Sequence, residues 1–319
     1  MRIVQGLESY PPDGPPAVVA LGVFDGIHLA HRKILTTAVA RAREAGLRAL
    51  ACTFDPSPVQ VLQPERAPIP ITTLEERLAL IAETGIEATI VLAFTPALAS
   101  VEPESFVREM LVGRLHAREV VVGYNHTFGR AARGDARMLD TLAGQLGFQA
   151  HVVAPLLVDG VPVSSTEIRT ALRAGDVERA QRYLGRPYAI GGEVIRGAGR
   201  GRSLGFPTAN IHPDRPLLVP AGVYACWAEV GGAGHPAVVN IGMRPTFGEN
   251  SLAVEAHLLD FTGDLYGRPA RLGFLARLRD ERKFPGPDAL REQITEDIAH
   301  ARRRLSNVSF TPTGSGGSI

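Results

Sequence analysis

Residues 18–46 read VVALGVFDGIHLAHRKILTTAVARAREAG. The first seven residues form an apolar run broken only by Gly22, as expected for a strand buried on both faces of a parallel sheet. After the run, apolar residues recur at the spacing of one helix face: Ile34, Leu35, Ala38, Val39 and Ala42. Gly46 is a typical helix stop. A buried strand followed by an amphipathic helix is the repeating unit of an α/β domain.

The same alternation continues along the first half of the chain. Four further apolar runs are predicted strands: Ala49–Phe54, Thr89–Phe94, Glu119–Tyr124 and Ala150–Ala154. Predicted helices lie among and after them: one capped by Thr73 and Glu76 and ending at Gly85, one from Pro103 to Gly113, and the short helices Glu167–Ala174 and Asp176–Leu184. We therefore expect residues 1–186 to form an α/β domain with a doubly wound parallel sheet.

The second half of the chain has a different sequence pattern. Runs rich in β-branched and aromatic residues alternate with Gly, Pro and Asn turns: Tyr188–Ile195, Val223–Val230, Ala237–Ile241, Ala253–Leu259 and Arg271–Leu278. This pattern predicts an antiparallel barrel or sandwich, and we favour the β-barrel. A helix is expected from Pro287 to about Arg304, which gives a domain over 187–305. The segment 306–319 is rich in Ser, Thr, Gly and Pro and is expected to be disordered.

Composition excludes several classes of protein. The 319 residues carry 34 basic and 33 acidic groups, a net charge of +1, which does not suit a nucleic-acid-binding surface. Lys33 and Lys283 are the only lysines and neither lies in a Walker A loop, so a nucleotide site would have to use other groups. No signal peptide or membrane-length apolar stretch is recognised. Cys52 and Cys226 are too far apart in sequence to suggest a disulfide framework, and we expect a cytoplasmic protein.

The junction between the first strand and the first helix is the candidate anion site of the α/β domain. Unpaired helix N–H groups point at a ligand there, and Gly22 and Gly26 allow close approach of the backbone. His28 and His31 can each donate to phosphate oxygens. Two alternatives stay open at this point. The histidines could be ordinary surface or core residues, or they could bind a metal with Asp25, although no third ligand follows at a conventional spacing.

Two later segments fall at other strand ends. The first runs from Gly123 to Arg130 and contains Asn125. The second holds three consecutive hydroxyls, Ser164, Ser165 and Thr166, followed by Arg169. These could bind the outer phosphates of a nucleotide, or the hydroxyls could merely cap a helix.

Four motifs together carry a family resemblance: GxFDGxHxxH, TFDPxP at Thr53–Pro58, VGxNxxFGxxxRG and SSTxIR. In this order they resemble the adenylyltransferase domain of bacterial bifunctional riboflavin kinase/FAD synthetase, a member of the HIGH-type nucleotidyltransferases. The resemblance implies transfer of AMP from ATP to FMN, giving FAD and pyrophosphate, with Mg²⁺ assisting. It also implies that His28 and His31 are catalytic and stabilise the ATP phosphates. The remaining ATP contacts that it implies are Gly22, Phe24, Asp25, Gly26, Asn125, Ser164, Ser165, Thr166 and Arg169.

One residue departs from this family pattern. The chain has Ala30 between the two histidines, where the family usually has glycine. The extra methyl group would hold the nucleotide slightly farther from the loop, so we expect slower adenylyl transfer that is nevertheless retained. Changing Ala30→Gly should then lower the KM for ATP in this reaction, and an unchanged KM would show that the methyl group is harmless.

A glycine-rich loop in the second half is the other nucleotide candidate. Gly197, Gly199, Gly201 and Gly205 permit positive φ angles, so successive N–H groups could converge on phosphate, and Arg200 adds charge. The alternative interpretation is that this segment is an ordinary flexible hairpin loop without a ligand. After Pro207, the side chains of Thr208 and Asn210 offer two neutral oxygens suited to a Mg²⁺ shared with ATP.

Glu255 is an acid inside an apolar strand. Period-2 alternation places it on the face opposite Val254 and Ala256. It could simply face solvent, or it could act as a general base that takes the proton of a primary alcohol during phosphoryl transfer.

The motifs of the second half resemble the riboflavin kinase domain of the same family. They are GxGRGxxLGFPTAN, NIGxxPTF, VExHLLDFxGDLYG and FLxRLRxExKF. The resemblance makes Thr208 and Asn210 the Mg²⁺/ATP ligands and Glu255 the base for the riboflavin 5′-hydroxyl. It assigns flavin contacts to Asn240 and Arg277. The ATP contacts of this domain would be Gly197, Gly199, Arg200, Gly201, Gly205 and Pro207.

The combined prediction is a bifunctional enzyme that phosphorylates riboflavin with ATP and then adenylylates the FMN. Its partners would be the small molecules riboflavin, FMN and ATP with Mg²⁺, without nucleic acid or membrane, and the motifs specify no oligomeric state. One alternative is a nucleotidyltransferase for another phosphorylated acceptor, such as a pantetheine or nicotinate derivative. Another is a flavin-sensing binding protein with inactive sites, which the presence of the site residues disfavours.

Overall fold

The computed structural model describes residues 1–197, 201, 204–243 and 252–306. The chain divides into two compact units, Met1–Ser165 and Thr166–Ile319. Among the described residues, no helix is both long enough and apolar enough to cross a membrane. The predicted disorder of the tail concerns 307–319 almost entirely, and these residues lie outside the described ranges.

The first unit is built on one parallel sheet of six strands, ordered β1-β4-β3-β2-β5-β6. The strands are β1 (Arg2–Gln5), β2 (Ala17–Leu21), β3 (Arg48–Phe54), β4 (Ala88–Leu92), β5 (Ala117–Gly123) and β6 (Gln149–Val153). The five predicted strands are all present. Strand β1 escaped prediction because it is short and only Val4 of its four residues is buried.

Helices cover both faces of this sheet, which confirms the doubly wound arrangement. They are α1 (Leu29–Ala45), α2 (Pro58–Leu62), α3 (Leu74–Ala82), α4 (Pro96–Ala99), α5 (Pro103–Ser105), which continues as a π-helix over Phe106–Arg114, and α6 (Ala136–Leu146). Short 3₁₀ turns lie at Pro64–Arg66 and Arg130–Ala132, and the strands β7 (Leu157–Val158) and β8 (Val161–Pro162) form a hairpin. Helix α6 had no counterpart in the prediction.

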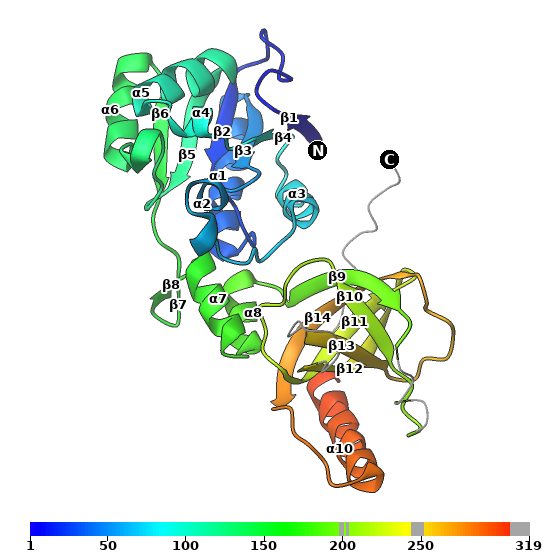
Figure 1. The fold of residues 1–319 in the computed structure, drawn as a ribbon. Helices are drawn as coiled ribbons and strands as arrows, with labels where there is room; N and C mark the ends of the chain where they lie inside the picture. The colour runs from blue at the N-terminus through cyan, green and yellow to red at the C-terminus, as the bar shows by residue number, and fades with distance from the viewer. Residues whose placement is uncertain (198–200, 202–203, 244–251, 307–319) are drawn as a thin grey trace. The chain divides into compact units, whose positions relative to one another are not determined.

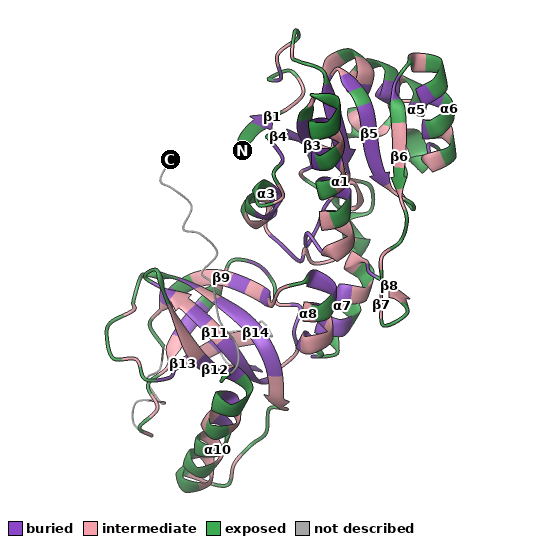
Figure 2. Ribbon diagram, turned by 180° about the vertical axis from the view of Figure 1, so that it is seen from behind, coloured by how far each residue is buried: buried purple, intermediate pink, exposed green. Residues whose placement is uncertain are grey.

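The central strand β2 shows how the two faces are separated. Val18 and Ala20 pack in one apolar cluster with α1, whereas Val19 and Leu21 pack in another with α6. This is the alternation expected of a strand buried on both sides. All five residues of β2 are buried, and Figure 2 shows that most of β5 is buried as well. The five apolar residues predicted to form the buried face of α1 are its buried residues, and Gly46 ends the helix with a left-handed φ of 67°.

The second unit contains a closed six-stranded barrel, which decides between the barrel and the sandwich. Its antiparallel order is β10-β13-β12-β11-β14-β9. The strands are β9 (Tyr188–Ile195), β10 (Ala209–Pro213), β11 (Gly222–Val230), β12 (Ala233–Met243), β13 (Leu252–Leu258) and β14 (Pro269–Arg279). Strand β10, which includes Asn210, was not predicted as a strand, yet it closes the barrel by pairing with both β9 and β13.

The helices that accompany the barrel among the described residues include α7 (Ser165–Arg173), α8 (Val177–Leu184) and α10 (Pro287–Leu305). Helix α10 lies against strands β11, β12 and β14, as Figure 1 shows. Its residues Ala301 and Leu305 share an apolar cluster with Val223, Val238 and Leu275 of the barrel. The barrel face under α10 is therefore a second core, separate from the barrel interior.

Candidate active sites

The sheet order places the candidate loops of the first unit side by side. From β2 the chain runs outward through β3 and β4, and it then returns to β5 on the other side of β2. The carboxyl ends of β2 and β5 consequently flank the point where the strand order reverses, which is where open α/β sheets bind ligands. The histidine loop follows β2, and Asn125 follows β5 in a turn closed by the His126 N–H and the Gly123 carbonyl, 3.0 Å apart.

The loop between β2 and α1 is held in an uncommon conformation. Phe24 and Ile27 have positive φ angles of 55° and 37°, a left-handed region that non-glycine residues rarely adopt, and Gly26 has φ 86°. Both apolar side chains are fully buried, so packing holds the backbone there. Backbone strain of this kind concentrates at binding sites.

His28 and His31 form one unit at the start of α1. His28 is the N-cap residue, and its Nδ1 accepts a hydrogen bond from the His31 backbone N–H at 3.2 Å. Because Nδ1 is the acceptor, the proton of a neutral His28 ring lies on Nε2. The two rings stack with centroids 3.6 Å apart, and Phe24 meets His31 edge-on at 5.4 Å.

His31 is neutral near pH 7. Burial, then the neighbouring His28, then the Arg77 cation hold the pKa of His31 well below its usual range. The buried Nδ1 of His31 has no hydrogen-bond partner among the described residues. His31 can thus offer a ring N–H to a phosphate oxygen, but it does not supply a full positive charge.

Arg77 is a residue of this region that sequence reasoning missed. It lies on α3 and is only 4% exposed, and its Nη1 donates to the carbonyls of Phe54 at 2.9 Å and Val23 at 3.3 Å. Burial lowers the pKa of Arg77, opposed by the nearby carboxylates of Asp25 and Asp55. Its place on the apolar face of α3 was the available signal, because an arginine buried in such a face must have polar partners.

Asp25 and Ser165 connect the loop to other segments. The Asp25 carboxylate accepts hydrogen bonds from the backbone N–H groups of Ile71 and Thr72 at 3.0–3.1 Å, so it anchors the loop. Ser165 Oγ donates to the Asp25 carbonyl at 2.9 Å, which brings Ser165 to the histidine loop. Thr166 and Arg169 follow on α7, in the second compact unit.

In the barrel, three predicted site residues lie in one row. Strand β13 places Glu255 directly opposite Asn210 of β10 on one side and Asn240 of β12 on the other. Directly opposite residues of antiparallel strands have Cβ atoms about 4.5–5.5 Å apart on the same face. Val254 and Ala256 are buried in the barrel and Glu255 is half-buried, as the alternation predicted. We call Asn210, Glu255 and Asn240 the polar row.

The glycine-rich loop packs directly on this row. A Cβ atom at Gly197 would overlap the side-chain amide of Asn210, and one at Gly201 would overlap the Phe206 carbonyl and lie 3.1 Å from Thr208 Oγ1. Of these described glycines only Gly205 has a positive φ, 90°. Gly197 and Gly201 do not adopt the positive φ that glycine permits, and at these two positions glycine is needed for space. Gly199 and Arg200 lie outside the described residues, whereas Pro207 is exposed and its carbonyl accepts from His257 Nδ1 at 2.8 Å.

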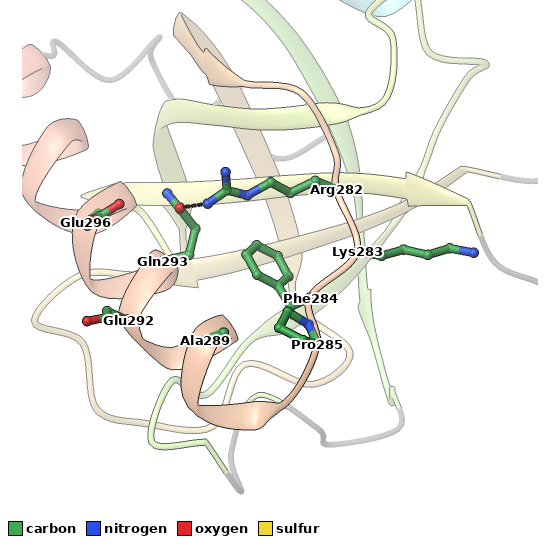
Figure 3. A pocket seen from close by; sticks show the side chains of 8 residues that line it. All are labelled: Arg282, Lys283, Phe284, Pro285, Ala289, Glu292, Gln293 and Glu296. Atoms are coloured by element: carbon green, nitrogen blue, oxygen red, sulfur yellow. Dashed lines mark hydrogen bonds between the residues drawn. The ribbon is translucent and has the colours of Figure 1, made fainter.

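A second segment approaches the polar row from the end of β14. A Cβ atom at Gly242 would overlap Glu281 and lie 3.4 Å from Asn240 Nδ2, so Glu281 occupies the space beside Asn240. The next residues line a pocket of about 400 Å³ between this segment and α10. Figure 3 shows the Phe284 ring standing between the loop and the helix, with Lys283 pointing away. The sequence indicated this segment through the FLxRLRxExKF motif, which ends at Phe284, and within that motif it named only Arg277 as a flavin contact.

Arg277 itself is engaged inside the protein. Its Nη2 donates to the Ala221 carbonyl at 3.0 Å and pairs with Asp280 at 3.0 Å, and its guanidinium lies 5.9 Å from the Tyr224 ring centroid. Gly175 packs against the same side chain. These contacts give Arg277 a structural part in the barrel, and its predicted flavin contact stays a prediction.

Known protein families match the two halves of the chain in the same order as the two sets of motifs. A family model described as FAD synthetase matches residues 11–167, and one described as riboflavin kinase matches residues 184–305. The bifunctional riboflavin kinase/FMN adenylyltransferase of Bacillus subtilis is 41% identical over 298 residues, covering 92% of this chain and 93% of that protein. The enzyme of the same name from Pseudomonas fluorescens is 37% identical over 303 residues, covering 95% and 97%.

A solved structure shares the fold of nearly the entire chain. It is the crystal structure of a Streptococcus pneumoniae protein described as a macrolide-efflux protein, with TM-score 0.88 and 30% identity. The likeness covers 97% of this chain and all of that one.

Proposed function

Because this chain belongs to the bifunctional riboflavin kinase/FMN adenylyltransferase family, we propose that two separate sets of its residues carry the two reactions. Its N-terminal domain is the FMN adenylyltransferase and its C-terminal domain the riboflavin kinase. We assign residues 1–186 to the first and 187–305 to the second. The family matches to residues 11–167 and 184–305 support this division.

In the adenylyltransferase domain, the stacked histidine pair at the N-terminus of α1 is the observation that carries the proposal. A phosphate oxygen of FMN attacks the α-phosphorus of ATP, the bond from that phosphorus to the bridging oxygen breaks, and pyrophosphate leaves with the electron pair. The attacking oxygen is already anionic, so no base is required. The ring N–H groups of His28 and His31 and the helix N-terminus stabilise the charge on the phosphates. Asn125, Ser164 and Ser165 complete the proposed ATP contacts of the first compact unit, and the ATP contacts of Thr166 and Arg169 stay predictions.

The substitution His28→Asn tests this assignment without removing the helix cap, because asparagine is itself a favoured N-cap residue. We expect FAD formation from FMN to fall by about 10²-fold, the usual cost of one charge-stabilising donor. FMN formation from riboflavin by the same protein serves as the folding control and should be unchanged. Undiminished FAD formation would contradict the role of His28.

In the kinase domain, the polar row carries the proposal. Glu255 takes the proton of the riboflavin 5′-hydroxyl while the hydroxyl oxygen bonds to the γ-phosphorus of ATP, and ADP leaves with the bridging oxygen. Asn210 and Asn240 flank the carboxylate with amide groups that orient it. The loop of Gly197 and Gly201 supplies backbone N–H groups to the ATP phosphates.

The residues present fit a Mg²⁺ ion that enters with ATP. Thr208, just before β10, and Asn210 on β10 offer hard, neutral oxygen donors, which Mg²⁺ prefers in combination with phosphate oxygens and water. The described residues contain no cluster of three or more His, Cys, Asp or Glu that could hold a metal ion. When bound, Mg²⁺ would neutralise charge on the β- and γ-phosphates. Thr208 and Asn210 would hold it, and Glu255 would remain available for the alcohol.

We place the riboflavin ring in the pocket lined by Phe284. Support comes from chain continuity, because Glu281 lies beside Asn240 of the polar row and the residues that follow it form the pocket wall. An aromatic side chain such as Phe284 suits a flat aromatic ligand. Asn240 would meet the part of the flavin nearest to Glu255.

The most direct test incubates the purified protein with riboflavin, ATP and Mg²⁺ and separates the products by chromatography. FMN should appear first and FAD second, and both should vanish when EDTA is added in excess over Mg²⁺. FMN without FAD would contradict the function of the N-terminal domain. Activity that survives EDTA would contradict the assignment of Mg²⁺.

A further inference from the structure

Asp297 on α10 is a buried carboxylate that lines neither proposed site. It is 5% exposed and is nearly saturated by hydrogen bonds. Arg279 Nε donates to its two oxygens at 3.0 and 3.1 Å, Arg279 Nη2 donates to Oδ2 at 2.8 Å, and Gln293 Nε2 donates to Oδ1 at 2.9 Å. A buried ion pair is weak evidence for a contribution to stability, because desolvation offsets the attraction. We therefore ask which residues the Asp297–Arg279 ion pair holds in place.

Both hydrogen-bond partners of Asp297, Arg279 and Gln293, are connected to the Phe284 ring by further contacts. The Arg279 guanidinium carbon lies 5.6 Å from the centroid of the Phe284 ring. Gln293 accepts a hydrogen bond from Arg282 through its Oε1, and the Arg282 guanidinium carbon lies 5.0 Å from the same centroid. Figure 3 shows the Arg282–Gln293 bond at the edge of the pocket, with the Phe284 ring beside it. Two cations lie against one aromatic ring, Arg279 bound directly to the Asp297 carboxylate and Arg282 bound to it through Gln293, and together they leave the ring little freedom.

We propose that Asp297 is a positioning residue for the flavin pocket, acting through Arg279 and Gln293 on Phe284. The segment 280–284 has no regular secondary structure, so its backbone would otherwise have to be ordered when riboflavin binds. The Asp297 network orders the segment in advance, which removes that cost from the affinity for riboflavin. The inference rests on the placement of riboflavin in this pocket.

The primary test measures riboflavin kinase kinetics of the full chain carrying Asp297→Asn. We expect the KM for riboflavin to rise at least about 10-fold, the equivalent of one charge-assisted hydrogen bond. The kcat and the KM for ATP should stay within about 2-fold, because the lost interaction is equal in ground and transition states. A fall in kcat with an unchanged riboflavin KM would overturn the proposal, since it would indicate general damage to the domain.

The matched control is Asp288→Asn, which removes an exposed carboxylate from the first turn of the same helix. It should leave the riboflavin KM unchanged. Arg279→Lys is a second test that keeps a charge paired with Asp297 in case the asparagine variant fails to fold. Lysine lacks the planar fork, so the riboflavin KM should rise here as well. An unchanged riboflavin KM in a folded Arg279→Lys protein would overturn the proposal.

A double-mutant cycle separates this inference from the pocket assignment. Phe284→Leu should raise the riboflavin KM, and Asp297→Asn in that background should add little, because both changes act through the same ring. If Asp297→Asn raises the riboflavin KM as much in the Phe284→Leu background as it does alone, Asp297 does not act through Phe284. If Phe284→Leu leaves the riboflavin KM unchanged, the pocket assignment itself fails. If Phe284→Leu raises the KM but Asp297→Asn does not, only the role of Asp297 fails.

Discussion

Glu255 shows at the scale of one residue why a carboxylate and not an amide is needed in the polar row. Its neighbours across both adjacent strands, Asn210 and Asn240, are amides that can orient a group but cannot accept a proton. Glu255 alone in the row combines a proton acceptor with a place at the surface of the barrel. The sequence indicated the residue and its face, and the strand register identified the two flanking amides.

The substitution Glu255→Gln keeps the shape of the side chain and removes its basicity. We expect kcat for FMN formation to fall by about 10²–10⁴-fold, the range of general base catalysis, while the melting temperature and FAD formation from FMN stay unchanged. The control is Glu193→Gln, which alters an exposed acid on β9 of the same barrel. FMN formation at the normal rate in Glu255→Gln would show that another group accepts the proton.

His126 is a second residue whose environment has a measurable consequence. Its ring stacks on Phe128 with centroids 6.1 Å apart, and burial lowers the pKa of His126 to about 4. In the unfolded chain a histidine titrates near pH 6.5. Between these values the unfolded state binds a proton that the folded state does not, so stability is full above about pH 6.5 and falls as the pH drops toward 4.

We therefore predict that His126→Phe flattens the pH dependence of stability. One such group contributes a slope of up to about 1.4 kcal/mol per pH unit in this window. Urea unfolding at pH 7 and pH 5 should show a smaller loss of unfolding free energy for the variant than for the unaltered protein. His31 contributes to the pH dependence of stability in the same direction in both proteins, so its contribution cancels when the two losses are compared. Equal losses would mean that His126 is accessible to protons in the folded state.

Among the structural elements, Gly197 and strand β10 show that a glycine can be required for space and not for its backbone conformation. The loop lies so close to the polar row that any side chain at Gly197 would displace the Asn210 amide. The sequence showed a run of glycines, but it could not show why each is there. The reason at Gly197 is an approach between two segments thirteen residues apart, which depends on how β10 pairs with β13.

The substitution Gly197→Ala should abolish most riboflavin kinase activity. The new methyl group forces Asn210 away from its place opposite Glu255, and overpacking of this kind typically costs about 1–3 kcal/mol. The control is Gly144→Ala in α6, where a Cβ atom meets nothing within 4 Å. That variant should keep both activities and gain up to about 1 kcal/mol of stability, measured by urea unfolding. Normal kinase activity in Gly197→Ala would contradict the close approach.

At the scale of the whole molecule, the two proposed sites share no residue, so their activities should be separable. We predict that a mixture of the Glu255→Gln and His28→Asn proteins converts riboflavin to FAD, although neither variant does so efficiently alone. The second protein makes FMN, which diffuses to the first. Chromatography of the mixture over time should show transient FMN followed by FAD. FMN that accumulates without FAD would show that the adenylyltransferase domain of Glu255→Gln is also impaired.

Local patterns in the amino-acid sequence predict most secondary-structure elements and the family resemblance of the chain. Apolar periodicity and caps located α1, five strands of the sheet and most strands of the barrel, because these signals act within a few residues. The motifs carried the family resemblance for the same reason. Strand β1 and strand β10 were missed because their own residues carry weak patterns, and they exist through pairing with distant strands.

Which distant residues meet depends on how the strands and helices pair and pack in the folded chain. The sheet order brings the ends of β2 and β5 together, the register of β10, β13 and β12 aligns Asn210, Glu255 and Asn240, and helix packing places Asp297 on Arg279. Burial in the folded chain also keeps His31 neutral, which residue identity alone does not specify. Each of these depends on contacts between segments far apart in sequence, and local periodicity contains no information about such pairings.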